Sequence, residues 1–488
     1  MSEHLTEQLV SLAYLVAIVL FTFGIKRMGK VRTARFGNAL SAVAMAIAIG
    51  ATLIHVSHNI VDWKFIAAGL VAGTLVGAVA AKRVPMTDMP EMVALFNGSG
   101  GAASFLVALS VLYGALKGWT PGITMAATNL GSPHLPTIGP EIAITLMLSV
   151  IVGGVTLTGS VVAYGKLSGK ISGNAVVYPG QHPLNFLLIL GTFGLAGYAG
   201  FGVTDPTTAS YLTIGVTVLS LVLGVLLVIP IGGADMPVVI SLLNSYSGIA
   251  AAMAGFVINN PLLIVVGATV GAAGLILTQI MCVAMNRSLL NVLVGGFGAN
   301  EGADLGDQEY HSVTSCGPEE AAMVLDAAES VIIIPGYGLA VAQAQHTCRE
   351  LADEMIKRGT KVTYAIHPVA GRMPGHMNVL LAEADVPYEQ LVEMEAINSE
   401  FRNTDVVLVV GANDVVNPAS LNDPKSPIYG MPILEVHHAK TVMVIKRSLS
   451  PGFAGIKNEL FEYDNTLMLF GDAKKMLQDL VSELKEAG

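Results

Sequence analysis

A glycine-rich segment at residues 336–341 has the residue types and spacing of a dinucleotide-binding loop. Its sequence is Gly-Tyr-Gly-Leu-Ala-Val; an apolar run at 330–335 precedes it and a helical stretch to about Arg358 follows it. In such a strand–turn–helix unit the first glycine allows a tight turn, the second lets a pyrophosphate approach the backbone, and the helix N-terminus supplies positive potential. The motif is weak in isolation, but this context favours a dinucleotide site over an ordinary strand–helix turn.

The charged residues indicate which dinucleotide would bind. A cofactor with a free ribose 2′-hydroxyl usually meets an acidic residue about 20 residues after the fingerprint, whereas residues 367–370, His-Pro-Val-Ala, contain no carboxylate. Lys446, Arg447 and Ser448 instead follow a later predicted strand, where ligands of open α/β sheets bind. Two cations and a hydroxyl suit a 2′-phosphate, so these residues favour NADP(H) over NAD(H). The alternative for the two cations is a solvated strand end.

The elements that must position these loops alternate along the C-terminal part of the chain. A helix opens at Pro318, a last amphipathic helix covers 474–486, and apolar strands are predicted at 330–335, 362–366, 406–410, 441–445 and 466–470. Such alternation is typical of a parallel sheet covered by helices. The sequence therefore predicts an α/β Rossmann-like soluble domain over 315–488, whose polar, glycine-rich loops at 371–375, 411–414 and 451–455 cradle the cofactor.

The 488-residue chain changes character near residue 300. Overall it is 53% hydrophobic and 13% charged; residues 1–300 hold 12 Lys/Arg and 8 Asp/Glu, while residues 301–488 hold 14 and 28. The composition excludes a disordered chain, and an acidic C-terminal part without a basic run argues against a nucleic-acid partner. The N-terminal part is expected in a lipid bilayer and the C-terminal part in water.

Nine apolar runs have the length that a membrane-spanning helix needs. We therefore predict a multi-span α-helical membrane bundle over 1–290, a junction and linker over 291–314 that is flexible at 299–314, and then the soluble domain. The predicted spans lie near residues 8–25, 38–56, 65–81, 91–115, 141–164, 184–203, 209–231, 236–258 and 262–285.

The Lys and Arg residues predict the orientation of these spans. Ten of them fall in the loops after the first, third, fifth and ninth spans, whereas the alternate loops carry only Lys64 and Lys117. Short cytoplasmic loops are enriched in positive charge. The N-terminus is thus expected outside the cytoplasm and the C-terminal domain inside it, with no signal peptide removed from the acidic N-terminus.

A few polar groups interrupt the apolar spans. Asp235 comes just before the eighth span, which contains Asn244 and Ser247 on one helical face, and the fourth span contains Glu91 and Asn97. An intramembrane carboxylate is costly unless it is paired or hydrated. The two carboxylates are expected either to face a helix dipole or to lie on a proton path. The two asparagines suit a water-lined path and simple interhelical hydrogen bonding equally well.

Histidines and cysteines add little chemistry. His55 and His58 fall at the outer end of the second span and His134 in an outer loop, so each is expected to be solvated. No histidine falls in the middle of a predicted span, where a proton relay would use one. The three cysteines are too scattered for a zinc cluster or a disulfide framework and are expected to be buried thiols.

The longer motifs of the chain resemble one known family. They are Met-Thr-Asp-Met-Pro-Glu at 86–91, Gly-Gly-Ala-Asp-Met-Pro-Val-Val at 232–239, Asn-Ser-Tyr-Ser-Gly at 244–248 and Met-Asn-Arg-Ser at 285–288, together with the soluble-domain loops. This combination, over essentially the whole chain, resembles the beta subunits of proton-translocating NAD(P) transhydrogenases.

The resemblance implies an assembly in the inner (plasma) membrane. An alpha subunit, of one or two chains, would carry the NAD(H)-binding domain and complete the membrane part, and two alpha–beta units would form a dimer. Hydride would pass directly from NADH to NADP⁺ while a proton moves inward. No metal, flavin or covalent nucleophile is expected, because the nicotinamides carry out the chemistry.

The resemblance also implies which residues act. Proton movement and coupling would involve Asp235, Asn244, Ser247, Asn97, Glu91 and Arg287, with the junction at 295–298. NADP(H) would contact Gly336, Tyr337, Gly338, Leu339, Ala340, Val341, Arg372, Met373, Pro374, Gly375, Gly411, Asn413, Asp414, Lys446, Arg447, Ser448, Gly452, Phe453, Gly471 and Asp472, with residues 446–448 at the 2′-phosphate.

The sequence departs from the family pattern at two positions. Phe453 replaces a tyrosine that many relatives have, which removes a phenolic contact. Asn97 replaces a histidine that some relatives have on the same helix. An amide cannot carry a proton, although it can order a water molecule, so the resemblance carries over Asp235 and Asn244 more firmly than any proton-binding residue at position 97.

Two other functions fit parts of the sequence. A transporter gated by a nucleotide-sensing domain would bind NADP(H) without transferring hydride. A membrane-tethered dehydrogenase would need a substrate pocket as well as a cofactor site within 315–488, a region too short for both, and would leave the polar groups of the eighth span unexplained.

Overall fold

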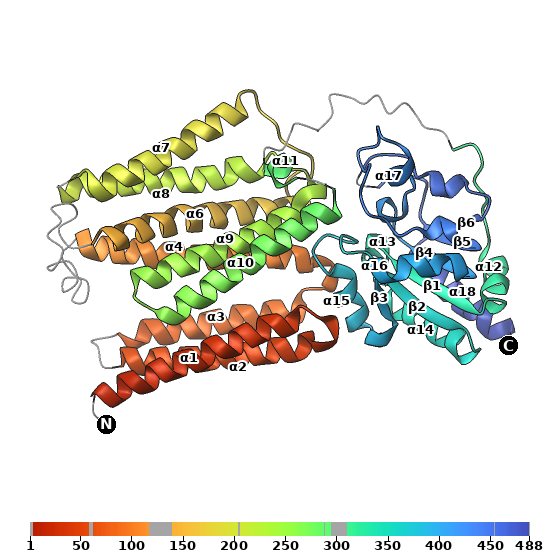
Figure 1. Ribbon diagram of the computed structural model, residues 1–488, viewed down its shortest axis with the longest axis horizontal. Coiled ribbons are helices and arrows are strands. Elements are labelled where there is room, and N and C mark those ends of the chain that lie inside the picture. Colours follow the sequence, from red (N-terminus) through yellow and green to blue (C-terminus); the bar gives the residue numbers. More distant parts are fainter. Residues whose placement is uncertain are drawn as a thin grey trace. The chain divides into compact units, whose positions relative to one another are not determined.

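The computed structural model describes residues 3–57, 62–116, 139–203, 205–286, 288–293, 310–452 and 454–487. They form two compact units, one of Met1–Gly233 with Val239–Thr278 and one of Ala234–Val238 with Gln279–Gly488. The first is built from helices and the second contains a sheet (Figure 1). Residues 299–309 of the linker predicted at 299–314, the junction at 295–298, and His58, His134, Arg287 and Phe453 lie outside the described residues.

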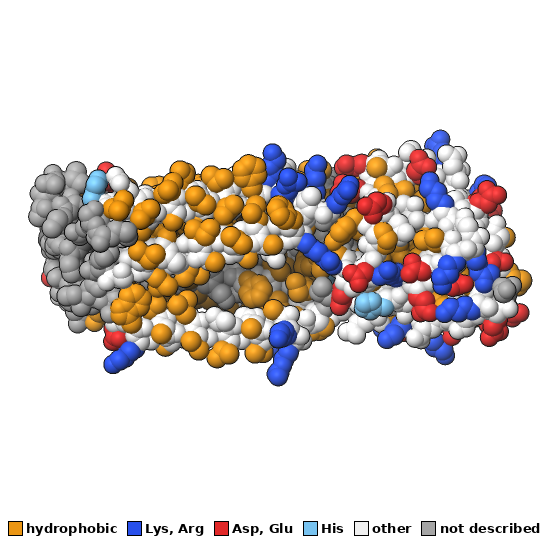
Figure 2. Space-filling model, turned by 90° about the horizontal axis from the view of Figure 1, so that it is seen from below, with side chains coloured by type: hydrophobic (Ala, Val, Ile, Leu, Met, Phe, Trp, Pro, Cys, Tyr) orange, Lys and Arg blue, Asp and Glu red, His pale blue; other side chains and the backbone are white. Residues whose placement is uncertain are grey.

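Nine helices in the described ranges are long and apolar enough to cross a membrane, as the sequence predicted. They are α1 (Glu3–Met28), α2 (Val31–Val56), α3 (Trp63–Arg83), α4 (Met89–Leu116), α6 (Pro140–Leu167), α7 (Gln181–Phe201), α8 (Pro206–Val228), α9 (Met236–Val257) and α10 (Pro261–Ala284). Hydrophobic side chains cover the visible surface of these helices (Figure 2). A bilayer would accept this surface, because lipid tails solvate exposed apolar side chains that water would not.

Small residues set how closely the membrane helices pack. A Cβ atom added at Gly248 of α9 would lie 2.5 Å from the backbone nitrogen of Gly271 in α10, and one added at Gly267 would lie 2.5 Å from that of Ala252. The two backbones therefore touch along this seam, which larger residues would force apart. Similarly, α4 packs along α6, and α6 along α8.

The sheet of the second unit is parallel throughout and has the strand order β3-β2-β1-β4-β5-β6. Its strands are β1 (Ser330–Pro335), β2 (Lys361–Ile366), β3 (Leu391–Glu393), β4 (Val406–Val410), β5 (Thr441–Lys446) and β6 (Thr466–Phe470). Alternate residues of three central strands, such as Ile332, Val407 and Val442, are buried in the core on one face of the sheet. The order is that of two mononucleotide-binding halves, with a reversal between β1 and β4.

The structure corrects two details of the predicted domain. It adds β3, an edge strand of three residues with no fully buried side chain, which has too little apolar pattern to be seen in the sequence. The fingerprint is itself helical over α13 (Tyr337–Val341), and the helix predicted after it is α14 (Gln345–Lys357). Gln343 between them has a φ of 48°, a left-handed conformation that ends a helix.

A short helix, α11 (Leu289–Leu293), follows α10. The remaining helices precede, connect or follow the strands of the sheet. They are α12 (Pro318–Asp326), α15 (His376–Glu383), α16 (Met394–Ile397), α17 (Ala419–Asn422) and α18 (Ala473–Ala487). Beside the sheet, α18 packs against both α12 and α14 (Figure 1).

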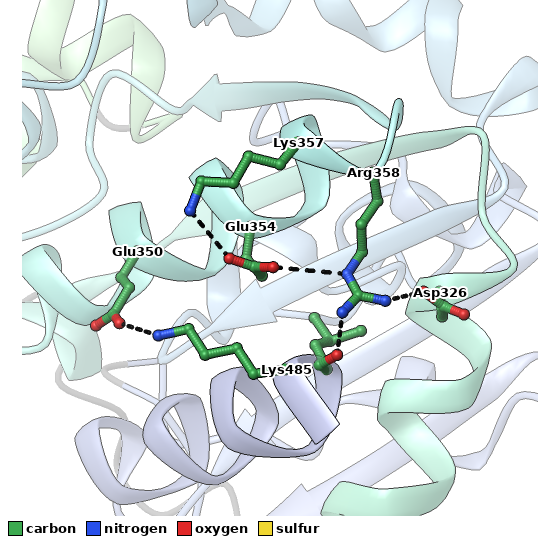
Figure 3. Close-up of polar contacts among 7 residues, drawn as sticks. Asp326, Glu350, Glu354, Lys357, Arg358 and Lys485 are labelled. Carbon is green, nitrogen blue, oxygen red and sulfur yellow. Dashed lines mark hydrogen bonds and ion pairs between the residues drawn. The ribbon is translucent and has the colours of Figure 1, made fainter. Parts of the chain in front are cut away.

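Arg358 joins these three helices. Its guanidinium lies 2.8 Å from the Asp326 carboxylate at the end of α12 and 3.7 Å from that of Glu354 in α14, and it donates to the Leu484 carbonyl oxygen of α18 (Figure 3). Only 21% of the Arg358 side chain is exposed. The neighbouring Lys485–Glu350 pair, at 2.7 Å, links α18 to α14 a second time.

Arg358→Ala is expected to lower the free energy of unfolding of this domain by about 1.5–3 kcal/mol. The substitution removes the half-buried guanidinium that joins α12 and α18 to the end of α14. The neighbouring Lys357 is the control, since its side chain is 71% exposed and pairs with Glu354 within the same helix, a type of pair worth about 0.3–0.5 kcal/mol. Hydrogen exchange of the strand amides in the intact chain measures both effects. Equal effects of Arg358→Ala and Lys357→Ala would contradict this account.

Candidate nucleotide site and membrane polar groups

The carboxyl ends of the central strands bring the predicted loops to one edge of the sheet. Pro335 of β1 pairs with Val410 of β4, and Val410 in turn with Ile445 of β5. Lys446 pairs with Phe470 of β6, and the Gly471 N–H donates to the Lys446 carbonyl oxygen at 3.0 Å. The loops that follow these strands therefore start next to one another, around the β1–β4 reversal where open α/β sheets bind ligands.

The fingerprint loop is pressed against the loop after β4. The Gly336 N–H donates to the Val410 carbonyl oxygen and the Gly338 N–H to that of Gly411, both at 2.9 Å. A Cβ atom at Gly336 would lie 2.3 Å from the Ala412 backbone nitrogen, and one at Gly411 would lie 2.4 Å from the Gly338 Cα atom. Contact between two protein backbones is thus a reason for these glycines, in addition to the approach of a pyrophosphate.

The Arg372 side chain lies over Tyr337 of the fingerprint loop. Its guanidinium carbon lies 4.4 Å from the centre of the Tyr337 ring, a cation–π distance. The Arg372 N–H donates to His376 Nδ1 at 3.0 Å, and Gly371 makes the tight turn with a φ of 111°. Met373 is buried, while Pro374 and Gly375 lead into α15. The arrangement places a cation beside the fingerprint.

The loop after β4 is held by residues further along the chain. Asn458 is fully buried, and its amide donates to the carbonyl oxygen and the side-chain oxygen of Asn413 at 3.1 and 3.0 Å. The Asp414 carboxylate accepts from the Ala454 N–H at 3.0 Å, and a Cβ atom at Gly452 would lie 2.3 Å from it. Asp414 and the 451–455 loop are therefore in direct contact.

The segment that follows β5 carries one half-buried cation, Lys446, and one exposed cation, Arg447. Lys446 is half-buried; it donates to the Ser450 carbonyl oxygen, and its ammonium lies 5.2 Å from the centre of the Phe461 ring. Burial lowers the pKa of Lys446 to about 8, against the opposing effect of Asp414. Arg447 and Ser448 are exposed, with the Ser448 hydroxyl 2.9 Å from that of Ser450. This segment offers two cations and a hydroxyl to one side of the edge.

Several predicted site residues lie where only part of them could reach a ligand. Leu339 and Ala340 have fully buried side chains, whereas Val341 is exposed. Asp472 accepts from the N–H groups of Lys474 and Lys475, so it caps α18. The predicted cofactor contact of Leu339 and Ala340 is therefore limited to the backbone, and that of Asp472 competes with helix capping.

Two residues that the sequence analysis did not select also shape the edge. Asn458 holds Asn413, and Tyr310 accepts the Asn458 N–H at 3.1 Å. A lone asparagine in an otherwise ordinary loop sequence gives no signal of this kind. Only the fold brings residue 458 to residue 413.

In the helical unit, Asn97 makes an interhelical hydrogen bond. Its amide donates to the Ile240 carbonyl oxygen of α9 at 3.1 Å, and its side chain is buried. Ser247 faces α4, since a Cβ atom at Gly100 would lie 3.5 Å from it, and its hydroxyl donates to the Asn244 carbonyl oxygen. Asn97 and Ser247 therefore belong to the α4–α9 contact.

The two carboxylates and His55 lie at helix ends. Glu91 is in the first turn of α4, Asp235 ends a 3₁₀ turn (Gly233–Asp235) directly before α9, and His55 is in the last turn of α2. Each of the three residues lies at the helix end where the sequence placed it.

Lys166 has a role that its sequence context did not reveal. It is 4% exposed, and its ammonium donates to the carbonyl oxygens of Asn174, Ile229 and Ile231 at 2.9, 2.6 and 2.8 Å. All three donors of the ammonium are thus used. The sequence had indicated only a positive loop charge, whereas this lysine ties the end of α6 to the segment that precedes Asp235.

Comparison with known proteins agrees with this architecture. The family model described as NAD(P) transhydrogenase beta subunit matches residues 10–483. Two curated proteins named NAD(P) transhydrogenase subunit beta, both from Rhodospirillum rubrum, are each 49% identical to the chain over 482 residues, which is 98% of this chain and 100% of the relative. The helices that can cross a membrane, the parallel nucleotide-binding sheet and this similarity over nearly the whole length show that the chain belongs to the NAD(P) transhydrogenase beta subunit family.

Proposed function

We propose that this chain binds NADP(H) and forms part of the proton path in a pump that couples inward proton movement to hydride transfer from NADH to NADP⁺. Residues 315–488 would bind the cofactor and residues 1–290 would translocate the proton, with 291–314 as the connection. The observation that carries the proposal is the contact between the fingerprint loop and the loop after β4, beside the cations that follow β5.

The residues at the sheet edge fit a phosphorylated dinucleotide. Lys446, Arg447 and Ser448 would hold the 2′-phosphate, because two cations and a hydroxyl match its charge and its acceptor oxygens. Arg372 lies over Tyr337, where it would bind a phosphate or close over the cofactor. When bound, the nicotinamide exchanges hydride with the nicotinamide of the partner's cofactor, so the chain itself supplies position and not a nucleophile.

An assembly follows from this proposal. The relatives are named as beta subunits, and this chain has one fingerprint, so NAD(H) would bind to an alpha subunit of one or two chains. A dimer of alpha–beta units would work in the inner membrane, with the N-terminus outside and the NADP(H) domain in the cytoplasm.

The membrane residues would divide the work of proton transfer. A carboxylate can take up and release a proton, whereas an amide cannot, so Asp235 and Glu91 would carry the proton, and Asn97, Asn244 and Ser247 would order water and hold α4 against α9. Arg287 and residues 295–298 would transmit the change. A potential of 100 mV supplies about 2.3 kcal/mol per charge, enough to change a cofactor binding constant about fiftyfold.

Arg372→Ala and Lys446→Ala are each expected to weaken NADP(H) binding by about 10- to 100-fold, because each removes a charge-assisted hydrogen bond to a phosphate. Calorimetry on the complex with the alpha subunit should show unchanged NAD(H) binding. Lys440→Ala is a matched control, since Lys440 precedes the opposite end of β5 and pairs with Asp405 at 2.7 Å. Equal weakening of both nucleotides would count against the assigned 2′-phosphate site.

NADPH affinity is expected to fall as the pH rises from 7 to 9. A lysine is charged below its pKa, and burial lowers the pKa of Lys446 to about 8, so the ammonium is lost within this range while a phosphate stays dianionic. The decrease should approach about tenfold per pH unit at most. In Lys446→Arg the guanidinium stays charged, so an unchanged pH slope in that variant would rule out Lys446 as the titrating group.

A further inference from the structure

The chain that enters the soluble domain is bound to the outer edge of its sheet. The Met468 N–H donates to the Thr314 carbonyl oxygen at 2.8 Å, and the Cys316 N–H donates to the Met468 carbonyl oxygen at 2.9 Å. Ser315 therefore pairs in parallel with Met468 of β6. Residues 314–316 thus run beside β6, on the side opposite β5.

Residues 310 and 311, which precede this pairing, contact residues 457–462, called the 457–462 block below. The Tyr310 ring stacks on Phe461 at 6.0 Å between ring centres, and the Tyr310 hydroxyl accepts the Asn458 N–H at 3.1 Å. The Lys457 ammonium lies 4.8 Å from the centre of the Tyr310 ring. One phenol therefore contacts three residues of the block.

Glu462 forms a second contact between the 457–462 block and the segment at residues 310–311. Its carboxylate accepts the His311 N–H at 2.6 Å and lies 2.6 Å from the Lys457 ammonium, with only 20% of the glutamate side chain exposed. A half-buried ion pair that also takes a backbone donor is stronger than a surface pair. The contact between residues 310–311 and the block is therefore polar, specific and directional.

The other side of the block faces the candidate nucleotide site. Asn458 donates twice to Asn413, Phe461 lies under the Lys446 ammonium, and the Lys457 carbonyl oxygen accepts from the buried Asn417 amide. Two residues of the block thus contact Tyr310 on one side and a candidate cofactor-binding residue on the other. A displacement of Tyr310 would be passed to Asn413 and Lys446 through packed side chains and hydrogen bonds.

We propose that Tyr310 is a positioning residue for the NADP(H) site, fixing Asn413 and Lys446 through the 457–462 block and anchoring there the chain that arrives from the membrane part. This inference rests on the proposed function. It adds a point of control that lies in none of the predicted cofactor loops.

Tyr310→Phe tests the inference in the intact complex with the alpha subunit. The substitution keeps the ring on Phe461 and removes only the acceptor of the Asn458 N–H. NADPH should bind about fivefold more weakly, the size of effect expected for one lost hydrogen bond, while NAD(H) binding stays unchanged. In the nucleotide-free complex, hydrogen exchange at the amides of Asn458 and Ala454 should become faster.

Tyr463→Phe is the matched control, because Tyr463 packs on the same core but contacts His437. It should leave the NADPH dissociation constant within twofold of the wild type. The inference is overturned if Tyr310→Phe also leaves that constant unchanged, or if both variants lower the melting temperature and the NADPH affinity in parallel, which would indicate general packing. A wild-type complex that binds no NADPH would instead overturn the proposed function.

Discussion

Gly411→Ala is expected to abolish detectable NADPH binding and to lower the free energy of unfolding of the sheet domain by about 3 kcal/mol. Gly411 has a φ of 69°, and its added Cβ atom would lie 2.4 Å from the Gly338 Cα atom. The obstacle is backbone and cannot rotate away, so the fingerprint loop and the loop after β4 must separate. Calorimetry with NADPH and hydrogen exchange of the strand amides would measure the two effects.

Gly359→Ala is the control that separates backbone strain from collision. Gly359 has a φ of 96° with no neighbouring atom within 4 Å of the added Cβ atom, and it follows α14, away from the predicted loops. Its substitution should cost about 1–2 kcal/mol of stability and leave NADPH binding intact. If Gly411→Ala behaves like Gly359→Ala, the contact between the two loops does not form the site.

The second large effect is expected in the membrane part. Asp235→Asn should reduce proton translocation and coupled hydride transfer by about a hundredfold or more, the usual contribution of a positioned proton carrier. The carboxylate ends the 3₁₀ turn before α9, and asparagine keeps its size but cannot take a proton. NADPH binding by the purified complex should be retained, which shows that the variant is folded.

Asp205→Asn provides a matched comparison at another helix start. The Asp205 carboxylate caps α8 by accepting the Thr208 N–H at 2.8 Å, and asparagine caps helices about as well as aspartate. This variant should pump normally. Intact pumping and intact hydride transfer in Asp235→Asn would remove Asp235 from the proton path.

The sequence predicted the elements of this fold because most of them carry strong local signals. A run of apolar residues long enough to cross a bilayer is a strong signal, so the nine membrane-length helices of the described residues were all predicted. The observed α1 extends from Glu3 to Met28, beyond the predicted 8–25. The apolar run before Gly336 and the glycines after it predicted the β1–α13 turn. The three residues of β3 were missed because an edge strand without a buried side chain has no such pattern.

The contacts that complete the candidate site could not be predicted, because they join residues that only the fold brings together. Asn458 reaches Asn413, Lys166 reaches the carbonyl oxygens of Ile229 and Ile231, and Asn97 reaches Ile240. None of these partners is near in sequence. Local patterns specify helices and strands, whereas hydrogen bonds across the fold depend on tertiary packing.

The distribution of charged residues along the sequence indicated a membrane part and an acidic soluble part. In the structure, several carboxylates of the soluble part form ion pairs between its elements. Asp326, Glu350 and Glu354 join helices through Arg358 and Lys485 (Figure 3). Glu462 binds the segment at Tyr310 to the block beside Asn413. These carboxylates organise the domain in addition to keeping it soluble.

Reconstitution of the chain with its alpha subunit in liposomes tests the central claim most directly. NADPH would be added with an NAD⁺ analogue, and reduction of the analogue would be followed together with the internal pH. We expect reduction accompanied by a pH change, and an uncoupler should abolish the pH change while reduction continues. Reduction without any pH change would contradict the pump, and NADPH binding without reduction would contradict the hydride transfer and favour a transporter gated by the nucleotide.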